Sequence, residues 1–348
     1  MTRSLRLGVL DQSPVCEGSD GATALRRSVD LAIFAEQLGY ERYWVAEHHG
    51  HAMIAGASPE VLIAAIAART ARMRVGSGGV MLPHYSPLKV AENFAALCGL
   101  YPGRIDLGLG RAPGSDQQTM FALQRDRRQV APDDFPDQLA ELLAYLEDDF
   151  PPGHPLARLA ALPGGPERPE VWLLGSSPQS GIWAAQLGLP YAFADFFATS
   201  PGAAIAQRYR SEFEPSARLA EPHVAIAVAA VAAKSDAEAQ RLASSRRMTA
   251  ALRDAGRIIP LPPVPKALAF LEQHADHARS PRAARDIVGS PETVRAGLEE
   301  VAEEYGADEV LVVTMTYDHA ARRRSYELIA EVFGLQARAL APDPLLAG

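Results

Sequence analysis

Glu47, His48, His49 and His51 lie within five consecutive positions, directly behind the apolar run YWVA. The chain has nine histidines, so a third of them are gathered here. An imidazole titrates near neutral pH and can transfer a proton or bind a metal ion. Neighbouring side chains of an extended segment point to opposite sides, and a zinc site needs three or four ligands. We therefore expect no metal site. One histidine is interpreted as a proton donor or base, with the other packed behind it and Glu47 as a structural residue.

A glycine-rich segment, VGSGGVMLP at 75–83, could lie against a flat ligand. Gly76, Gly78 and Gly79 have no side chains, so a ligand could approach the backbone closely. The alternative is a β-bulge, which also favours glycine inside a strand.

Two further segments contain groups that could bind an anion. LGLGRAPGS ends in a polar stretch with Arg111, which suits a phosphate or a surface salt bridge. In LGSSPQSGIWAAQLGLP an apolar run passes into a polar turn ahead of a helix, with Gly175, Ser176, Ser177 and Ser180. Hydroxyls and free backbone N–H groups at a helix N-terminus bind phosphate, although simple N-capping by a serine is the alternative. Three serines here, together with Arg111 elsewhere in the chain, favour a phosphate-binding site over simple N-capping.

The elements that must position these residues follow a regular alternation of short apolar runs and amphipathic helical stretches. Eight strand–helix units are the number that closes a parallel barrel, and nearly continuous apolar strands are typical of sheets buried on both faces. We predict a single-domain TIM (β/α)8 barrel, whose active site lies at the C-terminal ends of the strands. The predicted strands are LRLGVLDQ, YERYWVAE, MRVGSGGVMLP, RIDLGLGRAPG, PEVWLLGSS, PYAFADF, HVAIAVAAVAA and DEVLVVTMTY.

Two long segments interrupt the alternation, at 114–169 and 246–286. They follow the fourth and seventh strands, on the face where such barrels place their active sites, so we predict insertions there. Long insertions at this position often act as lids, and the alternative is a packing element or a dimer arm. We favour 246–286 as the lid.

Composition excludes several classes of protein. A net charge of -8 argues against nucleic acid and against an anionic membrane surface as partners. Two cysteines make no disulfide framework, and we find no secretory signal or membrane span, so a cytoplasmic location is expected. None of the lysines Lys89, Lys234 and Lys266 lies in a clear strand end, which argues against Schiff-base chemistry, and dinucleotide and nucleotide-hydrolase motifs are lacking.

With these motifs in view, the chain resembles the bacterial luciferase-like flavin monooxygenases over nearly its whole length. The segments that carry the resemblance are, in chain order, AEHHG, VGSGGVMLP, GRIDLGLGRAPG, LGSSPQSGIWAAQLGLP and VGSPETVRAGLEEVAEEYGADEVLVVTMTYD. The order and spacing of the segments make the match specific, and the two long insertions are the least certain part. The resemblance implies a barrel that binds FMN at the C-terminal ends of its strands.

Carried onto this sequence, the resemblance implies roles for single residues. His48 matches the active-site histidine that handles protons near the flavin, and Arg111 matches the arginine that binds the flavin phosphate. Gly78–Gly79 falls at a non-prolyl cis peptide beside the isoalloxazine ring. The phosphate would also lie against the polar turn of Gly175, Ser176, Ser177 and Ser180.

The substrate side of the pocket is defined less sharply. Asp11 and Ser13, which end the first strand, would line it by the same resemblance. Four aromatic residues suggest an apolar substrate, although aromatic residues at strand ends are more often part of a core: Tyr85, Phe193, Phe196 and Phe197.

The resemblance implies a two-component monooxygenase. A separate flavin reductase would supply reduced FMN, oxygen would add to it to give a peroxyflavin, and one oxygen atom would pass to a small organic, apolar substrate. The lack of a dinucleotide fingerprint agrees with a separate reductase. Gly110 stands where the bioluminescent subunit has a reactive cysteine, so light emission is not expected.

Two other functions are possible on this fold. One is an oxidoreductase that uses the deazaflavin coenzyme with the same histidine. The other is a flavin-binding subunit without turnover, against which the presence of both His48 and Arg111 argues. Members of the family usually form homodimers through early helices of the barrel, and the apolar stretch 61–68 suits such an interface or packing on the barrel.

Overall fold

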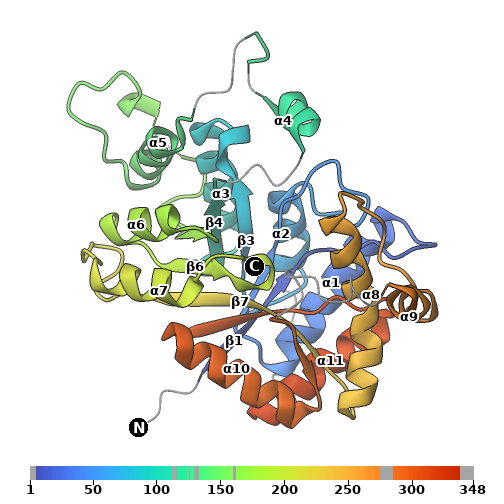
Figure 1. Cartoon of the computed structure of the whole chain (residues 1–348). Coiled ribbons are helices and arrows are strands. Elements are labelled where there is room, and N and C mark those ends of the chain that lie inside the picture. The colour runs from blue at the N-terminus through green and yellow to red at the C-terminus, as the bar shows by residue number, and fades with distance from the viewer. Residues whose placement is uncertain are drawn as a thin grey trace.

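Eight parallel strands close into a barrel, which confirms the predicted fold (Figure 1). The structure is a computed structural model that describes residues 5–111, 116–124, 126–128, 133–159, 162–274 and 285–337. The barrel strands are β1 (Arg6–Asp11), β2 (Arg42–Val45), β3 (Arg74–Met81), β4 (Ile105–Gly110), β5 (Glu170–Gly175), β6 (Tyr191–Ala194), β7 (Val224–Ala232) and β9 (Glu309–Val313). The ring closes because β9 pairs with both β1 and β7, and β6 pairs with both β5 and β7.

Helices surround the strands (Figure 1). They are α1 (Gly21–Leu38), α2 (Pro59–Ala67), α3 (Pro87–Leu100), α5 (Phe135–Glu147), α6 (Pro178–Gln186), α7 (Gly202–Ser211), α10 (Pro291–Tyr305) and α11 (His319–Phe333). Local chemistry fixes their ends: the Asp20 carboxylate accepts a hydrogen bond from the Thr23 backbone at the start of α1, and Gly39, with φ of 93°, ends that helix. No helix in these ranges has the length and apolar character needed to cross a membrane.

The predicted insertions after the fourth and seventh strands are present. After β4, α4 (Gln117–Leu123) precedes α5, and the short turn η2 (Ala157–Leu159) follows it. After β7 come α8 (Asp236–Asp254), α9 (Val264–Gln273) and β8 (Ile287–Gly289), which pairs in parallel with the end of β7. The sequence analysis did not predict β8, because three residues are too short to show a strand pattern.

The structure also shows that part of each predicted insertion is a packed helix. The range 114–169 contains α5, which packs against α3 as a regular helix of the barrel. The range 246–286 begins inside α8, where Met248 and Leu252 are buried, so its first part is a packed helix rather than a loop. Residues 112–115, 125, 129–132, 160–161 and 275–284 of these segments lie outside the described residues.

A buried ionic cluster fills the N-terminal end of the barrel. Arg42 of β2 pairs with Asp106 of β4 and, with 3.0 Å between Nε and Oε2, with Glu309 of β9. Trp44 donates a hydrogen bond to the same Asp106 at 2.9 Å and packs edge-on against Trp172, with ring centroids 5.2 Å apart. Burial opposes ionisation of Glu309, yet the hydrogen bond from His223 and the charge of Arg42 lower its pKa to about 2.

This cluster and the tryptophan pair fill the half of the barrel at the N-terminal ends of the strands. Above them the interior is apolar, with Leu10, Ala46, Ala227, Leu311 and Val313 in one buried cluster. In the part of the chain that the structure describes, the large cavity lies above this layer, at the C-terminal ends of the strands.

We predict that Arg42→Met lowers the free energy of unfolding by about 3–5 kcal/mol, because Asp106 and Glu309 stay buried without the guanidinium. Urea unfolding at neutral pH measures the change. The matched control is Arg295→Met, since Arg295 forms an exposed pair with Glu299 four residues away and should lose less than about 1 kcal/mol. Similar losses for the two variants would contradict a structural role for the buried cluster.

Candidate active site

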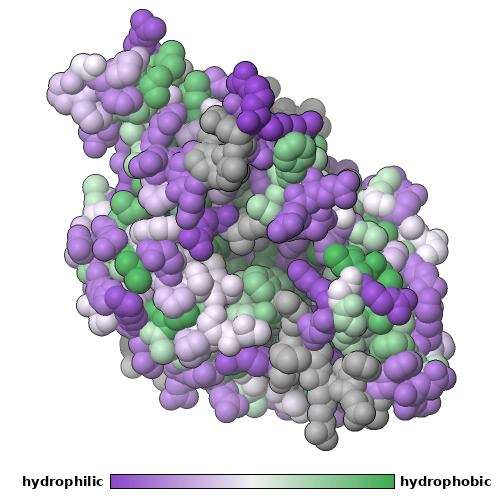
Figure 2. All heavy atoms as spheres, turned by 45° about the horizontal axis from the view of Figure 1, so that its top comes forward, coloured by the Kyte–Doolittle hydropathy of each residue, from purple (hydrophilic) through white to green (hydrophobic). Residues whose placement is uncertain are grey.

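A cavity of about 990 Å³ opens at the C-terminal ends of β3, β4, β5 and β6. Figure 2 shows this hollow, with hydrophobic surface at its floor and mostly hydrophilic side chains around it. Its size is suited to a cofactor or drug-sized ligand. Of the predicted site residues, the structure brings seven together in its lining: Gly78, Gly79, Arg111, Gly175, Ser176, Ser177 and Ser180.

One wall of the cavity is backbone. The peptide between Gly78 and Gly79 is cis, which confirms the predicted non-prolyl cis peptide. A Cβ atom on Gly79 would lie 2.3 Å from Leu174 and 2.6 Å from the Gly108 carbonyl oxygen, so no side chain fits there. The β3–β4 register also shifts between Gly78 and Val80. The bulge and the bare wall, which the sequence left as alternatives, are thus both present.

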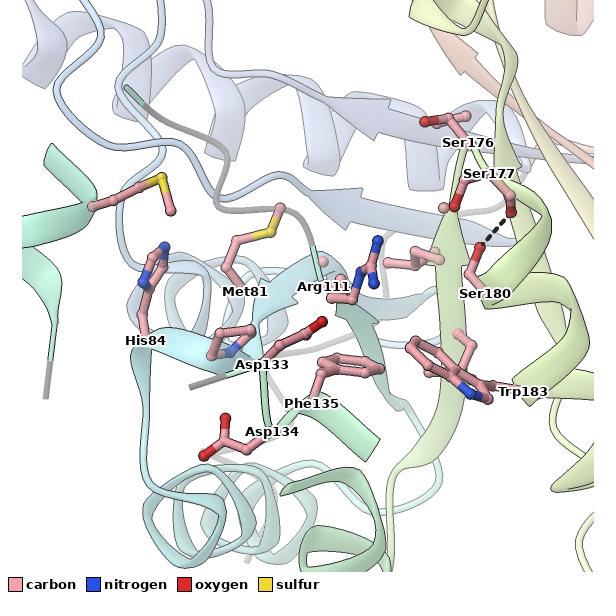
Figure 3. Close-up of a pocket in the computed structure, with 18 of the residues that line it drawn as sticks. Met81, His84, Arg111, Asp133, Asp134, Phe135, Ser176, Ser177, Ser180 and Trp183 are labelled. Atoms are coloured by element: carbon pink, nitrogen blue, oxygen red, sulfur yellow. Dashed lines mark hydrogen bonds between the residues drawn. The ribbon is translucent and has the colours of Figure 1, made fainter. Parts of the chain in front are cut away.

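The opposite end of the cavity is polar (Figure 3). Ser177 is the N-cap residue of α6, but its side chain makes no capping hydrogen bond, and the Ser180 hydroxyl instead donates to the Ser177 carbonyl oxygen at 3.0 Å. The N-capping alternative is therefore wrong for Ser177. The first-turn N–H groups of α6 are not taken up by that side chain, which leaves them able to bind an anion.

Arg111 completes this polar end. It follows β4 and extends into the cavity, with its guanidinium carbon 5.7 Å from the ring centroid of Trp183 (Figure 3). Within the described ranges Arg111 forms no ion pair, so the surface salt bridge considered from the sequence is not found there. A permanent cation, serine hydroxyls and a helix N-terminus facing one cavity are the donor set that a phosphate requires.

Apolar side chains line much of the remaining cavity, and of these the sequence had indicated Phe197 alone as a pocket residue. Phe135 and Trp183 stack at 5.3 Å, and α4 contributes Met120 and Phe121 from above. Trp183 lies one turn after Ser180 in the serine-rich motif, which is a spacing that could have identified it. Helix α4 is too short for its apolar residues to show a helical period. The apolar lining is completed by Met81, Pro83, Leu173, Leu174, Ala194 and Phe197.

His48 lies beside this cavity rather than in its lining. It follows β2, the neighbour of β3, and its backbone N–H donates to the Gly56 carbonyl oxygen at 2.7 Å. Its Nδ1 is buried and has no hydrogen-bond partner among the residues that the structure describes. Burial, together with the nearby His51 and Arg253, lowers the pKa of His48 to about 4. The ring is consequently neutral at pH 7, and one of its nitrogens carries a lone pair.

Glu47 and His49 are turned away from His48, as the alternation of an extended chain requires. The Glu47 carboxylate is fully buried and accepts hydrogen bonds from the Tyr85 hydroxyl at 2.7 Å and from the Met81 backbone at 3.0 Å. Its other contact is the Nε2 atom of His49 at 2.6 Å. Both residues therefore hold the end of β3 in place, and the histidines do not converge on one point.

The structure does not place Asp11 and Ser13 at the cavity. Leu10 faces the barrel interior, so the next residue of β1, Asp11, faces the surrounding helices. There its carboxylate pairs with Arg322 at 2.6 Å, fully buried. Ser13 is also buried, and its hydroxyl lies 2.9 Å from that of Ser28.

The predicted pocket positions of Phe193 and Phe196 also require correction. Phe193 is fully buried and packs against Tyr305 of α10, with ring centroids 5.5 Å apart, so it belongs to the core. Phe196, in the short turn η3 (Asp195–Phe197), packs against the apolar cluster inside the barrel. Its neighbour Phe197, 4.8 Å away edge to face, is the one that lines the cavity.

Comparison with known proteins decides the family. The family model described as luciferase-like monooxygenase matches residues 5–309. The chain belongs to this family. It is 42% identical to the luciferase-like monooxygenase of Escherichia coli K12, over 95% of this chain and 97% of that protein.

Two further relatives show how closely this member of the luciferase-like family resembles characterised and solved proteins. The N-acetyl-S-alkylcysteine monooxygenase of Bacillus subtilis strain 168 is 38% identical, over 94% of this chain and 98% of that protein. The crystal structure of apo-MsnO8 superposes with a TM-score of 0.86 at 41% identity, covering 97% of this chain and 99% of that one.

The low pKa of His48 predicts an acid-sensitive fold. Between pH 6.5 and about 4 the unfolded chain binds a proton at this position that the native protein does not. The free energy of unfolding should therefore fall as the pH decreases through this range, by at most about 3 kcal/mol, at about 1.4 kcal/mol per pKa unit. Urea unfolding across this range should show a smaller decrease for His48→Gln than for the wild type.

The control for this comparison is His154→Gln, because His154 stacks on Phe150 away from the cavity. It should keep the wild-type pH dependence. An unchanged dependence in His48→Gln would contradict the assignment of a buried, neutral imidazole.

Proposed function

We propose that the chain is the oxygenating component of a two-component monooxygenase. It would bind reduced FMN from a separate reductase and use O2 to oxygenate a small organic substrate. One observation carries the proposal: a single cavity combines a phosphate-binding end at Arg111 and α6 with a side-chain-free wall at Gly78–Gly79. Membership of the luciferase-like monooxygenases supports the type of reaction.

The residues present fit FMN. Arg111 and the first turn of α6, with Ser176, Ser177 and Ser180, would hold the phosphate, and Gly78–Gly79 would face the flat ring. When bound in its reduced form, the flavin supplies the two electrons with which one atom of O2 enters the substrate and the other leaves as water. The protein binds and orients the cofactor and excludes water.

His48 would hold and move the proton that this reaction needs. Its Nδ1 is enclosed, which leaves Nε2 as the ring atom able to exchange a proton with a ligand. A neutral imidazole can accept a proton from a ligand and later return the proton to the same ligand. The apolar residues Met120, Phe121 and Phe197 would keep water away from the reacting atoms.

The lining also suggests what kind of substrate fits. Most of the cavity is apolar, and sulfur-containing Met81 and Met120 provide adaptable surface for an alkyl or thioether group. The Bacillus relative that oxygenates an N-acetyl-S-alkylcysteine supports an alkyl-bearing substrate. We infer a small organic molecule with an apolar part.

We also propose a homodimer in which α2 contributes to the interface. Leu62, Ile63 and Ile66 of α2 are buried against the barrel, as the packing alternative requires. Val61 on the same helix is 67% exposed and would be covered by a second copy. Light scattering on a size-exclusion column tests this, with Val61→Glu expected to shift the protein to a monomer.

We predict that Arg111→Met weakens binding of reduced FMN by about tenfold or more, since a hydrogen bond to a charged group contributes about 1.5–3 kcal/mol. Binding of reduced riboflavin, which has no phosphate, should change little. Anaerobic fluorescence titration measures both constants. The control is Arg158→Met, because Arg158 is exposed in η2 and lies outside the cavity. Equal losses for FMN and riboflavin would contradict a phosphate contact.

We predict that His48→Gln lowers oxygenation by about 10²–10⁴-fold, the usual contribution of a general acid–base residue, with little change in FMN affinity. The readout is ¹⁸O incorporation from ¹⁸O2 into a panel of aldehydes and alkyl thioethers, with reduced FMN supplied by a reductase. His154→Gln is again the control. Oxygenation at the wild-type rate in His48→Gln would remove the proton-transfer role.

A further inference from the structure

Helix α4 lies over the cavity without being part of the packed core. None of its seven described residues is buried, and it stands apart from the helices around the barrel (Figure 1). Two of its apolar side chains stay open to solvent, with Met120 36% and Phe121 54% exposed. A helix that is held by packing buries its apolar face, as α5 does with Leu139 and Leu142. Core packing therefore contributes little to holding α4 in place.

The exposed apolar face of α4 is turned toward the cavity. Gln117, Met120, Phe121 and Gln124 all line the cavity, at positions i, i+3, i+4 and i+7. Residues at this spacing share one face of a helix, and the apolar pair lies in the middle of it. A molecule bound in the cavity would cover these two side chains and remove them from water.

The ends of α4 are stabilised by residues of its own segment. At the start, the Asp116 carboxylate accepts hydrogen bonds from the backbone N–H and from the hydroxyl of Thr119, each at 2.9 Å. At the other end, Arg127 donates to the Ala122 carbonyl oxygen and lies over the ring of Phe121, 5.9 Å from its centroid. Because these contacts do not involve the barrel, α4 can change its position and stay helical.

A close approach joins α4 to the loop that follows β2. Gly50 of that loop has a φ of 61°, and a Cβ atom on it would lie 2.5 Å from the Thr119 hydroxyl oxygen and 3.4 Å from the Thr119 Cβ atom. A residue with a side chain would therefore push α4 away. The contact is small, so breaking it exposes little surface to water.

The second insertion is tied down much more firmly. The Leu261 backbone N–H donates to the Val15 carbonyl oxygen at 2.8 Å, and the Glu17 backbone N–H donates to the Leu261 carbonyl oxygen at 2.9 Å. Lys266 of α9 pairs with the Glu17 carboxylate at 2.6 Å. These ties favour α4 as the moving element, in place of the segment 246–286 that the sequence favoured as a lid.

We propose that α4 is a movable cover of the cavity. It separates from Gly50 to admit a molecule of flavin size, and it returns with Met120 and Phe121 against the bound molecule. The closed position excludes water from the ligand. This inference concerns entry and release, so it goes beyond the proposed reaction and does not depend on it.

The test is a reversible cross-link between α4 and the loop. The double variant Gly50→Cys, Thr119→Cys suits a disulfide, because the 3.4 Å between the two Cβ positions is close to the usual range of about 3.5–4.5 Å. The native Cys16 and Cys98 are buried. Stopped-flow fluorescence then measures the association and dissociation of oxidised FMN and, separately, of the anionic dye anilinonaphthalene sulfonate. We expect both rates to be at least about tenfold lower in the oxidised variant than in the same protein after reduction.

Matched variants separate the cover from other causes. Gly50→Cys alone, treated with the same oxidant, should show no such difference between its oxidised and reduced forms. Lys266→Met loosens the second insertion and should leave the rates unchanged. Phe121→Ala should speed dissociation severalfold, because the cover loses an apolar contact with the bound molecule. Leu159→Ala, which removes an exposed apolar side chain outside the cavity, should not.

The outcomes are distinct. Unchanged rates in the oxidised double variant, failure of the cross-link to form, or binding of neither probe would overturn the cover. If the dye is slowed by the cross-link and FMN does not bind, the cover is supported and the proposed cofactor is contradicted. No oxygenation is measured, so the result is independent of whether the chain proves to be an oxygenase.

Discussion

The buried charge of Arg42 is the constraint on which the rest of the structure depends. It must be neutralised inside the barrel, and Asp106 and Glu309 from two other strands do so. Removing charges from water is costly unless the partners are well placed, so this cluster fixes which strand ends meet at the N-terminal end. With Trp44 and Trp172 packed above it, that end is closed. The large cavity that the described residues enclose lies at the opposite end.

At that open end, the glycines, which have no side chains, are as important as the residues whose side chains line the cavity. Glycines at the end of β3 form a wall that no larger residue could occupy, because Leu174 and the Gly108 backbone stand directly behind it. Glu47 then holds the chain beyond β3 through the Met81 backbone and Tyr85. The result is a cavity between a wall without side chains and a polar end. This arrangement is consistent with the flat, phosphorylated cofactor that we propose, and the neighbouring loop presents His48.

Much of the fold could be predicted from the sequence, because each barrel strand is an apolar run long enough to be distinguished. The polar end of the cavity could also be predicted, since Arg111, the serines and the start of α6 can be recognised in the sequence. Asp11 and Phe193 were misplaced because residues at strand ends alternate between the interior and the helices, and only the three-dimensional partners, Arg322 and Tyr305, show which way each one faces. The cover provided by α4 could not be predicted, since its contribution depends on where the chain folds back over the strands.

We propose that this cavity binds reduced FMN, which then reacts there with O2. The most direct test is an anaerobic titration with reduced FMN, followed by rapid mixing with O2 while the absorbance is recorded. We expect saturable binding of one FMN per chain, and then a transient band that matches neither the reduced nor the oxidised flavin. Binding that is followed only by simple oxidation would point to the deazaflavin coenzyme or to a subunit without turnover. No binding at all would contradict the assignment of the cavity.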